Sequence, residues 1–481
     1  MAQNPALPTL RPFIAGDWID GDDAISPLAD KFTDETVAYV QASSPAQVTA
    51  LVDAAAARAE GPALPLAERA RILHTASALV TARRDELIAL VQLDAGFTLA
   101  DAVKEVDRTS ETLRLCAEET TRLVGEMLPL SGVAGHEGRI AFTRYDAIGI
   151  VVAITPFNSP LNTVAHKVGP AIGAGNSVIL KPASQTPLSA DALLRILLEA
   201  GLPPEMISVV YGSGSIVGNA LAADPRPGYY AFTGSTRVGE ELHRSVGMRR
   251  TQLEMGSIAS TIICADADLE RAAMLATNAS FRKSGQVCTS VQRLYVHRDV
   301  IDEVAQLMAE RLAPLRAGDP RDSSTYVGPL IAPREAERVR SWIDEAVARG
   351  ADVVAGGTSD RNVVSPTVLR NTRADDAVMR SEVFGPVVSL CPFDTLDEAI
   401  TQANATEYGL ASGIFTRDVG TALAAADRLK AGSVHINETS SSRVDMMPFG
   451  GLKRSGFGGT EGPKYAIRDM SEERVVTLSR P

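Results

Sequence analysis

The stretch from Ile148 to Val246 constrains the fold most, because it repeats one pattern four times: a short apolar strand, a turn and a helix, punctuated by glycines. Strands that alternate with helices in this way pair in parallel, and their connections cross over in the right-handed sense. The pattern predicts a doubly wound α/β sheet with its ligand crevice at the carboxyl ends of the strands. The predicted strands span 148–154, 176–181, 207–211 and 229–233, and the predicted helices span 164–172, 189–200, 216–223 and 237–246.

A second alternating region follows and predicts a second α/β domain, which suits a chain of 481 residues at about 100–200 residues per domain. We therefore expect two domains with a ligand cleft between them. The predicted helices of this region span 269–281, 301–312, 334–349 and 396–403, and its strands span 293–297, 383–391 and 434–437. Ahead of both regions, the sequence predicts a hairpin over 13–20 and helices over 46–59, 66–95 and 101–124.

Charge and hydropathy exclude several kinds of partner. The net charge is −12 at pH 7, so the chain has no electrostatic reason to bind nucleic acid or an anionic membrane. The longest apolar stretch, 148–154, is far shorter than the roughly 20 residues that span a bilayer. The first residues lack the basic and apolar regions of a signal peptide. We expect a cytoplasmic protein with neither nucleic acid nor membrane as a partner.

The four cysteines do not form a metal site or a disulfide framework. None belongs to a CxxC pair, and none stands at metal-ligand spacing from a histidine. Reduced thiols are expected in so long a chain without a signal peptide, and free cysteines are commonly packing residues. One cysteine differs, because Cys288 lies among glycine and small polar residues in the segment 284–289. That setting is compatible with an accessible nucleophile or with a buried structural thiol. The other three are Cys116, Cys264 and Cys391.

Two glycine-rich turns are candidates for a phosphate site. The segment 233–239 leaves a predicted strand and enters a predicted helix, whose N-terminus favours an anion. The segment 212–218 is closer to GxGxxG but is also imperfect. Neither turn is diagnostic alone, because glycine turns between strand and helix are common.

Two further residues, Glu254 and Asn158, each have a catalytic interpretation and a structural one. Glu254 stands beside an apolar run, where it is either a helix-start or solvent residue, or a buried general base with a raised pKa. Asn158 follows the first predicted strand, so its amide is either a turn former or a hydrogen-bond donor to a developing oxyanion.

Seven segments taken together resemble the aldehyde dehydrogenase superfamily over nearly the whole chain. Their order and spacing match as well, including the 34 residues from Glu254 to Cys288. The segments are 155–158, 180–183, 232–235, 253–256, 285–288, 382–386 and 448–456.

The resemblance implies oxidation of an aldehyde to a carboxylic acid with hydride transfer to NAD or NADP. It implies that Cys288 attacks the carbonyl carbon, which gives a thiohemiacetal and then a thioester. The Asn158 side chain and the Cys288 backbone N–H would stabilise the alkoxide, and Glu254 would activate the hydrolytic water. These roles suit a soft nucleophile, preorganised donors and a base.

The resemblance also implies a set of residues for the cofactor. Lys181 would contact the adenine ribose, Gly234 and Ser235 would form the phosphate turn, and Glu382 and Phe384 would lie near the nicotinamide. The complete predicted set is Thr155, Pro156, Lys181, Ser184, Gly212, Phe232, Gly234, Ser235, Glu382 and Phe384. In addition, Glu461 matches a residue that is sometimes assigned to proton relay.

Departures from the family pattern bear on specificity. Many NAD-preferring members carry Glu at the position of Ser184, and a carboxylate there would repel a 2′-phosphate, so we predict that NADP is accepted. Val287 stands where relatives acting on phosphorylated or phosphonate aldehydes often carry Arg, which argues against a phosphate-bearing substrate. Arg108 and Arg443 are either anion-binding or structural. Phe157 belongs to a loop that resembles the pocket of lactaldehyde-type and semialdehyde-type members, for a small aliphatic or hydroxylated aldehyde.

Two more segments depart from the family pattern: the residues after Glu254 and a segment near the N-terminus. The Gly-Gly that commonly follows the base is replaced by Gly256-Ser257-Ile258, which predicts a slightly different placement of Glu254. The segment 26–40 lacks the usual Asn-Pro-Ala-Thr-Gly stretch, and we predict that it is a divergent surface loop.

The predicted fold class is α/β, with two doubly wound α/β domains and a small β oligomerisation flap. The resemblance implies a Rossmann-like cofactor domain from 1–122 and 147–253, a catalytic domain from 254–456, and oligomerisation strands from 123–146 and 457–481. We accordingly expect a homodimer or homotetramer.

Two other functions compete with this prediction. A CoA-acylating aldehyde dehydrogenase would release the acyl group to a thiol, but such relatives commonly lack the base at the position of Glu254. A non-catalytic protein with the same fold would tend to lose Cys288, which is present here.

Overall fold

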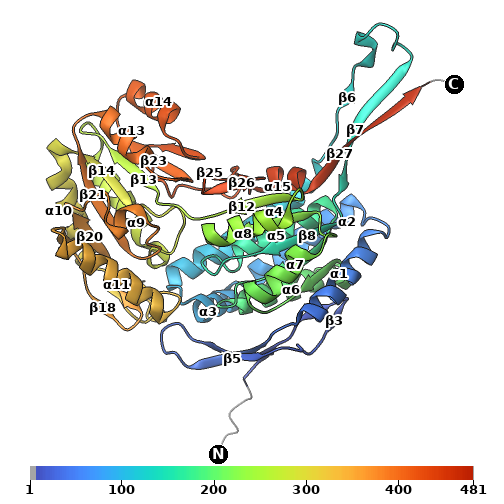
Figure 1. Cartoon of the computed structure of the whole chain (residues 1–481), viewed down its shortest axis with the longest axis horizontal. Coiled ribbons are helices and arrows are strands. Elements are labelled where there is room, and N and C mark those ends of the chain that lie inside the picture. The colour runs from blue at the N-terminus through green and yellow to red at the C-terminus, as the bar shows by residue number, and fades with distance from the viewer. Residues whose placement is uncertain (1–6, 480–481) are drawn as a thin grey trace, which may run out of the picture.

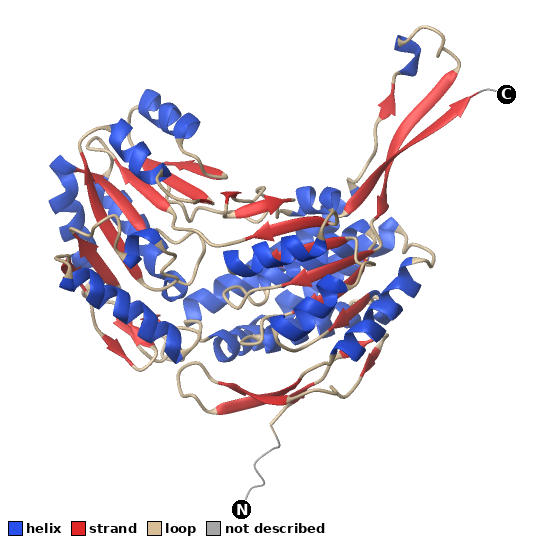
Figure 2. Ribbon diagram, in the orientation of Figure 1, coloured by secondary structure: helices blue, strands red, loops and turns tan. Residues whose placement is uncertain are grey.

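A computed structural model describes residues 7–479, and its body contains two large sheets, each covered by helices (Figures 1 and 2). The first sheet has eight strands in the order β26-β12-β11-β8-β9-β10-β2-β3. Strands β8 to β12 run parallel, whereas β26 and β2–β3 add antiparallel edges. The strands are β2 Phe13–Ile14, β3 Asp17–Trp18, β8 Ile150–Ile154, β9 Ser177–Lys181, β10 Ile207–Val209, β11 Tyr229–Thr233, β12 Arg250–Glu254 and β26 Gly456–Gly458.

Helices pack on both faces of this sheet, as the doubly wound prediction requires. Along β8, Ile150 and Val152 pack with α1, α7 and α8, while Val151 and Ala153 face the core formed with α2 to α6. Strands buried on both faces are continuously apolar, which explains the run in the sequence. The helices are α1 Pro45–Ala59, α2 Leu66–Ala82, α3 Arg84–Ala95, α4 Leu99–Thr121, α5 Asn162–Ala174, α6 Pro187–Glu199, α7 Asn219–Ala223 and α8 Thr236–Val246.

Two of the predicted helices differ from the structure. The single helix predicted over 66–95 is two helices, because Arg83 leaves the helical region at φ −103° and ψ 22°. The helix predicted over 216–223 begins as a π turn at Gly214–Gly218 and continues as α7.

The second sheet has seven strands in the order β17-β20-β21-β14-β13-β23-β24, parallel except for β17. Helices α9 and α10 pack on one face, and α11 to α14 pack on the other. The strands are β13 Ser260–Ile263, β14 Arg293–His297, β17 Asp352–Ala355, β20 Thr367–Arg370, β21 Val387–Phe393, β23 Ala411–Phe415 and β24 Ser433–Ile436. The helices are α9 Leu269–Phe281, α10 Ile301–Leu312, α11 Pro333–Ala348, α12 Ala377–Arg380, α13 Leu396–Asn404 and α14 Val419–Arg428.

The strand predicted over 383–391 starts later, at β21. Phe384 has φ +46°, a left-handed conformation that a strand does not accommodate. The residues before β21 therefore form a loop, and this loop carries Glu382 and Phe384 towards the other sheet.

The prediction of a surface loop over 26–40 is wrong. Strand β4 (Ile25–Ala29) pairs antiparallel with β5 (Thr36–Gln41), and β1 (Thr9–Leu10) adds a third strand in parallel. Leu28 and Ala38 are buried under the body, so the segment contributes core despite its divergent sequence.

A three-stranded arm projects from the body, at the upper right of Figure 1. Strand β7 (Arg139–Ala147) pairs with β27 (Ser471–Ser479) along its whole length, and β6 (Met127–Leu128) pairs with its other side. Helix α15 (Pro463–Asp469) leads from the body into β27. Strands β6 and β7 lie largely within the predicted segment 123–146 and β27 within 457–481, but α15 occupies part of the second segment, and the role of these strands in oligomerisation stays a prediction. Apolar side chains on the arm, including Ile140 and Val475, are exposed. Within residues 7–479, the structure contains no helix that is both long enough and apolar enough to cross a membrane.

Candidate active site

A cavity of about 1220 Å³ lies where the carboxyl ends of β8, β11 and β12 face the loops of the second sheet. The predicted catalytic residues Cys288, Glu254 and Asn158 all line it, as do Glu461 and the arginines Arg108 and Arg443. The predicted cofactor residues line the same cavity except for Gly212, whose carbonyl oxygen accepts a hydrogen bond from the Ser184 hydroxyl at 3.2 Å. The sheets therefore bring together residues that are up to about 350 positions apart in the chain.

Cys288 is the one partly exposed cysteine in the described chain, because the other three are buried. It follows a tight turn in which Lys283, Ser284 and Gly285 all have left-handed backbones, at φ +50°, +55° and +70°. A Cβ on Gly285 would lie 2.1 Å from the Gly385 carbonyl oxygen, so only glycine fits there. Burial and the nearby Glu382 carboxylate raise the pKa of Cys288 to about 12, which keeps the resting group a thiol.

Asn158 lies in the loop between β8 and α5, beside the segment that carries Cys288. Its Nδ2 donates to the Gln286 carbonyl oxygen at 2.9 Å. A primary amide has two N–H donors, so this bond orients the group and leaves a donor for another acceptor.

Glu254 is the last residue of β12 and is almost fully buried. Neither carboxylate oxygen has a hydrogen-bond partner within the described part of the chain. Burial first, and then the Glu461 carboxylate, raise the pKa of Glu254 well above 4.5. A buried carboxyl group with free oxygens and a raised pKa is suited to accept a proton and return it.

Glu461, in contrast to Glu254, is held in its ionised form. It accepts from Lys167 Nζ at 3.1 Å and from Arg443 Nη2 at 2.9 Å. These two cations lower its pKa far below 4.5 although the group is buried. Glu461 is therefore a fixed anion, and its charge contributes to the raised pKa of Glu254.

Lys181, Gly234 and Ser235 are cavity residues that could hold a dinucleotide. Lys181 ends β9 and is buried, and burial lowers its pKa to about 8. Its ammonium donates to the Pro182 carbonyl oxygen at 3.3 Å. Gly234 leaves no room for a side chain, since a Cβ would stand 2.7 Å from the Phe232 ring. Ser235 precedes α8, whose free N–H groups favour phosphate.

Glu382 and Phe384 close the centre of the cavity from the second sheet. Glu382 Oε1 accepts from the Ser257 backbone N–H at 2.9 Å, and burial raises its pKa to about 7. Phe384 packs edge-on against Phe157, with ring centroids 5.6 Å apart. A Cβ at Gly256 would lie 2.9 Å from Glu382 Oε2, so this glycine gives Glu382 its space.

The two arginines singled out from the sequence are both neutralised by carboxylates. Arg108 makes a two-pronged contact with Asp445, at 2.7 and 3.0 Å. Asp445 also accepts from Asn162 and contacts His166 Nε2 at 2.8 Å. Arg443 pairs with Glu461, as described above. Both arginines line the cavity, yet each has a structural partner.

A third arginine in the cavity was not found from the sequence. Arg282 makes no ion pair among residues 7–479, and its guanidinium donates to the Ser441 hydroxyl at 2.6 Å. Burial and the nearby Arg108 lower its pKa. Ser441 is in turn 3.1 Å from the Thr289 hydroxyl. The sequence signal that could have found it is the pair of adjacent cations, Arg282 and Lys283, which follows the predicted helix 269–281 shortly before Cys288.

The chain is similar to known aldehyde dehydrogenases over nearly its whole length. The model of the aldehyde dehydrogenase family matches residues 18–476. A 3-sulfolactaldehyde dehydrogenase of Priestia aryabhattai is 40% identical over 467 residues, covering 97% of both chains. Among solved structures, aldehyde dehydrogenase 21 of Physcomitrella patens in complex with its reaction product succinate matches with a TM-score of 0.94 and 35% identity, covering 98% of both chains. An NADP-dependent enzyme of E. coli matches with a TM-score of 0.94 and 34% identity, again covering 98% of both.

The chain therefore belongs to the aldehyde dehydrogenase family. It is an enzyme, an NAD(P)-dependent aldehyde dehydrogenase, as the resemblance in the sequence predicted.

Proposed function

We propose that this enzyme oxidises a short aldehyde that carries an anionic group, a carboxylate or a sulfonate, to the free acid. The observation that carries the proposal is Arg282, a guanidinium in the cavity that no carboxylate of the described chain neutralises. A guanidinium binds an oxyanion such as a carboxylate or a sulfonate through two parallel N–H bonds, and it prefers such a charged partner to a hydroxyl. Ser441 and Thr289 stand beside it as further donors.

The relatives support an anionic substrate. The relative from Priestia is a 3-sulfolactaldehyde dehydrogenase, and the structure from Physcomitrella holds succinate as its reaction product. Both names describe short molecules that end in an anion. Val287 beside the nucleophile continues to argue against a phosphate.

In the proposed mechanism the Cys288 thiol loses its proton to solvent water as Sγ attacks the aldehyde carbon, which gives the alkoxide of a thiohemiacetal. The Asn158 amide and the Cys288 backbone N–H donate to its oxygen, which develops negative charge. When bound, NAD or NADP would supply the nicotinamide ring that accepts the hydride in the oxidation to a thioester. Glu254 then takes a proton from water, which attacks the thioester and releases the acid. Burial and the fixed anion Glu461 raise the pKa of Glu254, which makes its carboxylate a stronger base.

The substrate proposal is tested with 4-oxobutanoate, which is an anionic aldehyde, and with its neutral amide. Replacing Arg282 with methionine should lower kcat/KM for the anion by about 10²–10³-fold, because truncating one partner of a buried charge pair costs about 2–5 kcal/mol. The neutral amide should change by less than about threefold, since it never used that charge. Steady-state kinetics on both aldehydes measures this.

The matched control is Lys104→Met, because Lys104 is an exposed cation that lines the same cavity. A similar loss of kcat/KM for 4-oxobutanoate in this variant would contradict the proposal. It would mean that the overall positive electrostatic potential of the cavity selects anions, and not a contact with Arg282. A wild-type enzyme that oxidises the amide as well as 4-oxobutanoate would contradict the proposal outright.

We propose further that NADP is accepted, because no carboxylate follows Lys181 at the third position. The Ser184 hydroxyl is exposed at the cavity edge, where it can donate to a 2′-phosphate. Changing Ser184 to Glu should raise KM for NADP by about tenfold or more through charge repulsion, with KM for NAD nearly unchanged. Initial rates with both cofactors measure this, with Ser184→Ala as the uncharged control. A wild-type KM for NADP more than about tenfold above that for NAD would contradict the prediction.

Assembly into a homodimer or homotetramer is part of the same proposal. The arm of β6, β7 and β27 extends beyond the body and exposes Ile140, Val475 and Leu478. Apolar side chains on an unpaired sheet edge are commonly covered by another subunit.

A further inference from the structure

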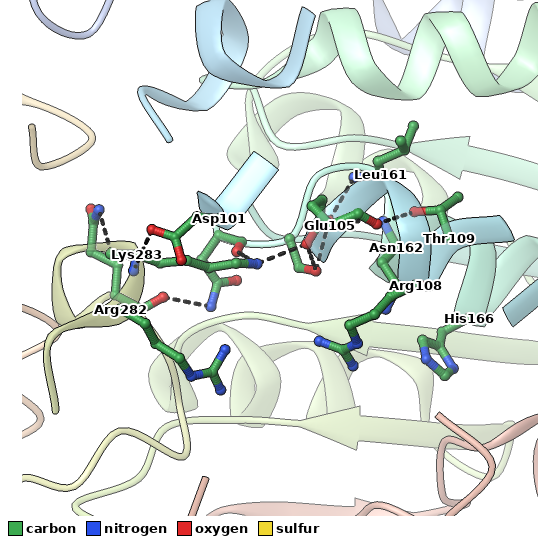
Figure 3. Close-up of polar contacts among 12 residues, drawn as sticks. Asp101, Glu105, Arg108, Thr109, Leu161, Asn162, His166, Arg282 and Lys283 are labelled. Atoms are coloured by element: carbon green, nitrogen blue, oxygen red, sulfur yellow. Dashed lines mark hydrogen bonds and ion pairs between the residues drawn. The ribbon is translucent and has the colours of Figure 1, made fainter. Parts of the chain in front are cut away.

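A buried carboxylate behind the cavity collects donors from two chain segments that the proposed mechanism needs. Glu105 of α4 accepts from Lys283 Nζ at 2.7 Å and from the Ser159 hydroxyl at 2.8 and 2.9 Å. It also accepts from the backbone N–H groups of Leu161 and Asn162, at 3.2 and 2.9 Å. Figure 3 shows Glu105 between Lys283 on one side and the start of α5 on the other. These donors all belong either to residues 158–162, here called the Asn158 loop, or to residues 282–288, here called the Cys288 loop.

The ammonium of Lys283 is the link between those two loops. Besides Glu105, it donates to the backbone carbonyl oxygen of Asn158 at 2.9 Å. It also lies 4.5 Å from the centre of the Phe97 ring. The side chain is 7% exposed and that of Glu105 is fully buried, so water does not screen this ion pair.

The backbone of Lys283 is held as firmly as its side chain. Its N–H donates to Asp101 Oδ2 at 2.9 Å, and its carbonyl oxygen accepts from the Gln286 N–H at 3.0 Å. Lys283 and Ser284 are consecutive non-glycine residues in the left-handed region, a conformation that persists only where the surroundings over-determine it. The contacts of Lys283 supply that constraint, and Cys288 follows five residues later.

We propose that Lys283 and Glu105 are positioning residues, which together set the distance between the Asn158 amide and the Cys288 backbone N–H. This inference rests on the proposed function, in which those two donors stabilise the alkoxide. Lys283 fixes Asn158 through its ammonium and the Cys288 loop through its backbone, so one residue determines both halves of the oxyanion site. Its charge is neutralised by Glu105, and it does not serve to activate the thiol.

The central variant is Lys283→Met, which keeps the length of the side chain but removes the donor. We expect kcat to fall about 100-fold, because a displacement of about 1 Å in a catalytic constellation has an effect of that size. KM for the aldehyde should change by less than about threefold, since Arg282 is retained. Alkylation of Cys288 by iodoacetamide in the free enzyme, followed by mass spectrometry, should keep its rate within about twofold, because that reaction develops no oxyanion.

The double variant Lys283→Met/Glu105→Gln separates positioning from stability. Lys283→Met alone leaves a buried carboxylate without its cation, so Tm should fall. The double variant removes both charges, and Tm should recover towards the wild-type value, whereas kcat should stay about 100-fold low because Asn158 has still lost its donor. Recovery of kcat together with Tm would overturn the proposal, because the pair would then act through stability alone.

The control is Asp376→Asn, which weakens a pair with Arg349 at 3.1 Å in the second sheet domain, away from the residues that line the cavity. Its Tm should fall while kcat stays near the wild-type value. An equal loss of kcat in this control, or faster alkylation of Cys288 in Lys283→Met, would also overturn the proposal, because either result indicates general loosening. Failure of the proposed function is recognised separately, since turnover in Cys288→Ala would refute it whatever Lys283 does.

Discussion

Replacing Cys288 with alanine should abolish aldehyde oxidation, with a fall in kcat of about 10⁴-fold or more. The substitution removes the atom that forms the proposed thiohemiacetal and thioester, and no other described cysteine reaches the cavity. The measurement is NAD(P)H formation in steady state and in a single turnover. Binding of the cofactor should persist, because the residues predicted to hold it, such as Lys181 and Ser235, are unchanged.

The matched control for this experiment is Cys391→Ala. Cys391 is a free thiol of the same chain, but it is buried in the core of the second sheet. Its activity should stay within about twofold of the wild type, with a modest loss of stability from the small cavity. Residual turnover in Cys288→Ala that responds to the aldehyde would refute the covalent mechanism, since no nucleophile would be left to carry it.

Replacing Glu254 with glutamine should separate the two halves of the reaction. The proposed attack by Cys288 and the hydride transfer need no base at this position, so a burst of about one NAD(P)H per active site should remain. Hydrolysis needs a proton acceptor, so steady-state turnover should fall by about 10²–10⁴-fold. Stopped-flow absorbance at the NAD(P)H band measures both phases, and isolation of the acyl enzyme by mass spectrometry identifies what accumulates.

Turnover by the wild-type enzyme should depend on pH, in a direction that follows from the raised pKa of Glu254. Burial and the Glu461 charge raise the pKa of Glu254 well above 4.5, so below that raised value the carboxyl is protonated and cannot accept a proton. Turnover should therefore increase as pH rises through that pKa, and Glu254→Gln should lose this limb of the profile. An unchanged profile in the variant would assign the proton transfer to another group.

The same variant also tests the CoA-acylating alternative. A hydrolytic enzyme should give the free acid whether or not CoA is present. Formation of an acyl-CoA by the wild type, with a rate that Glu254→Gln leaves unchanged, would identify the thiol as the true acceptor.

Local pattern in the sequence was sufficient for the parts of the fold that depend on near neighbours. The apolar runs such as 150–154 become central parallel strands, because a strand buried on both faces must be apolar throughout. The short motifs around Asn158, Glu254 and Cys288 indicated the reaction, because covalent aldehyde oxidation needs a thiol, a donor and a base in one place. The family resemblance supplied their roles, and the comparisons confirmed the family and the kind of enzyme.

The sequence by itself thus determined the fold class, the family and the identity of the chemical groups. Only the tertiary structure decided how the charges pair, because Arg108 meets Asp445 across more than 300 residues of chain, whereas Arg282 meets no carboxylate in the described part. It also decided that 26–40 forms strands, since the body of the protein buries Leu28 and Ala38. Nothing in the local sequence marks Lys283 as different from a surface lysine. In the folded protein its ammonium contacts both Glu105 and the Asn158 carbonyl oxygen. The burial of a charged group depends on the residues that surround it, and not on the segment that carries it.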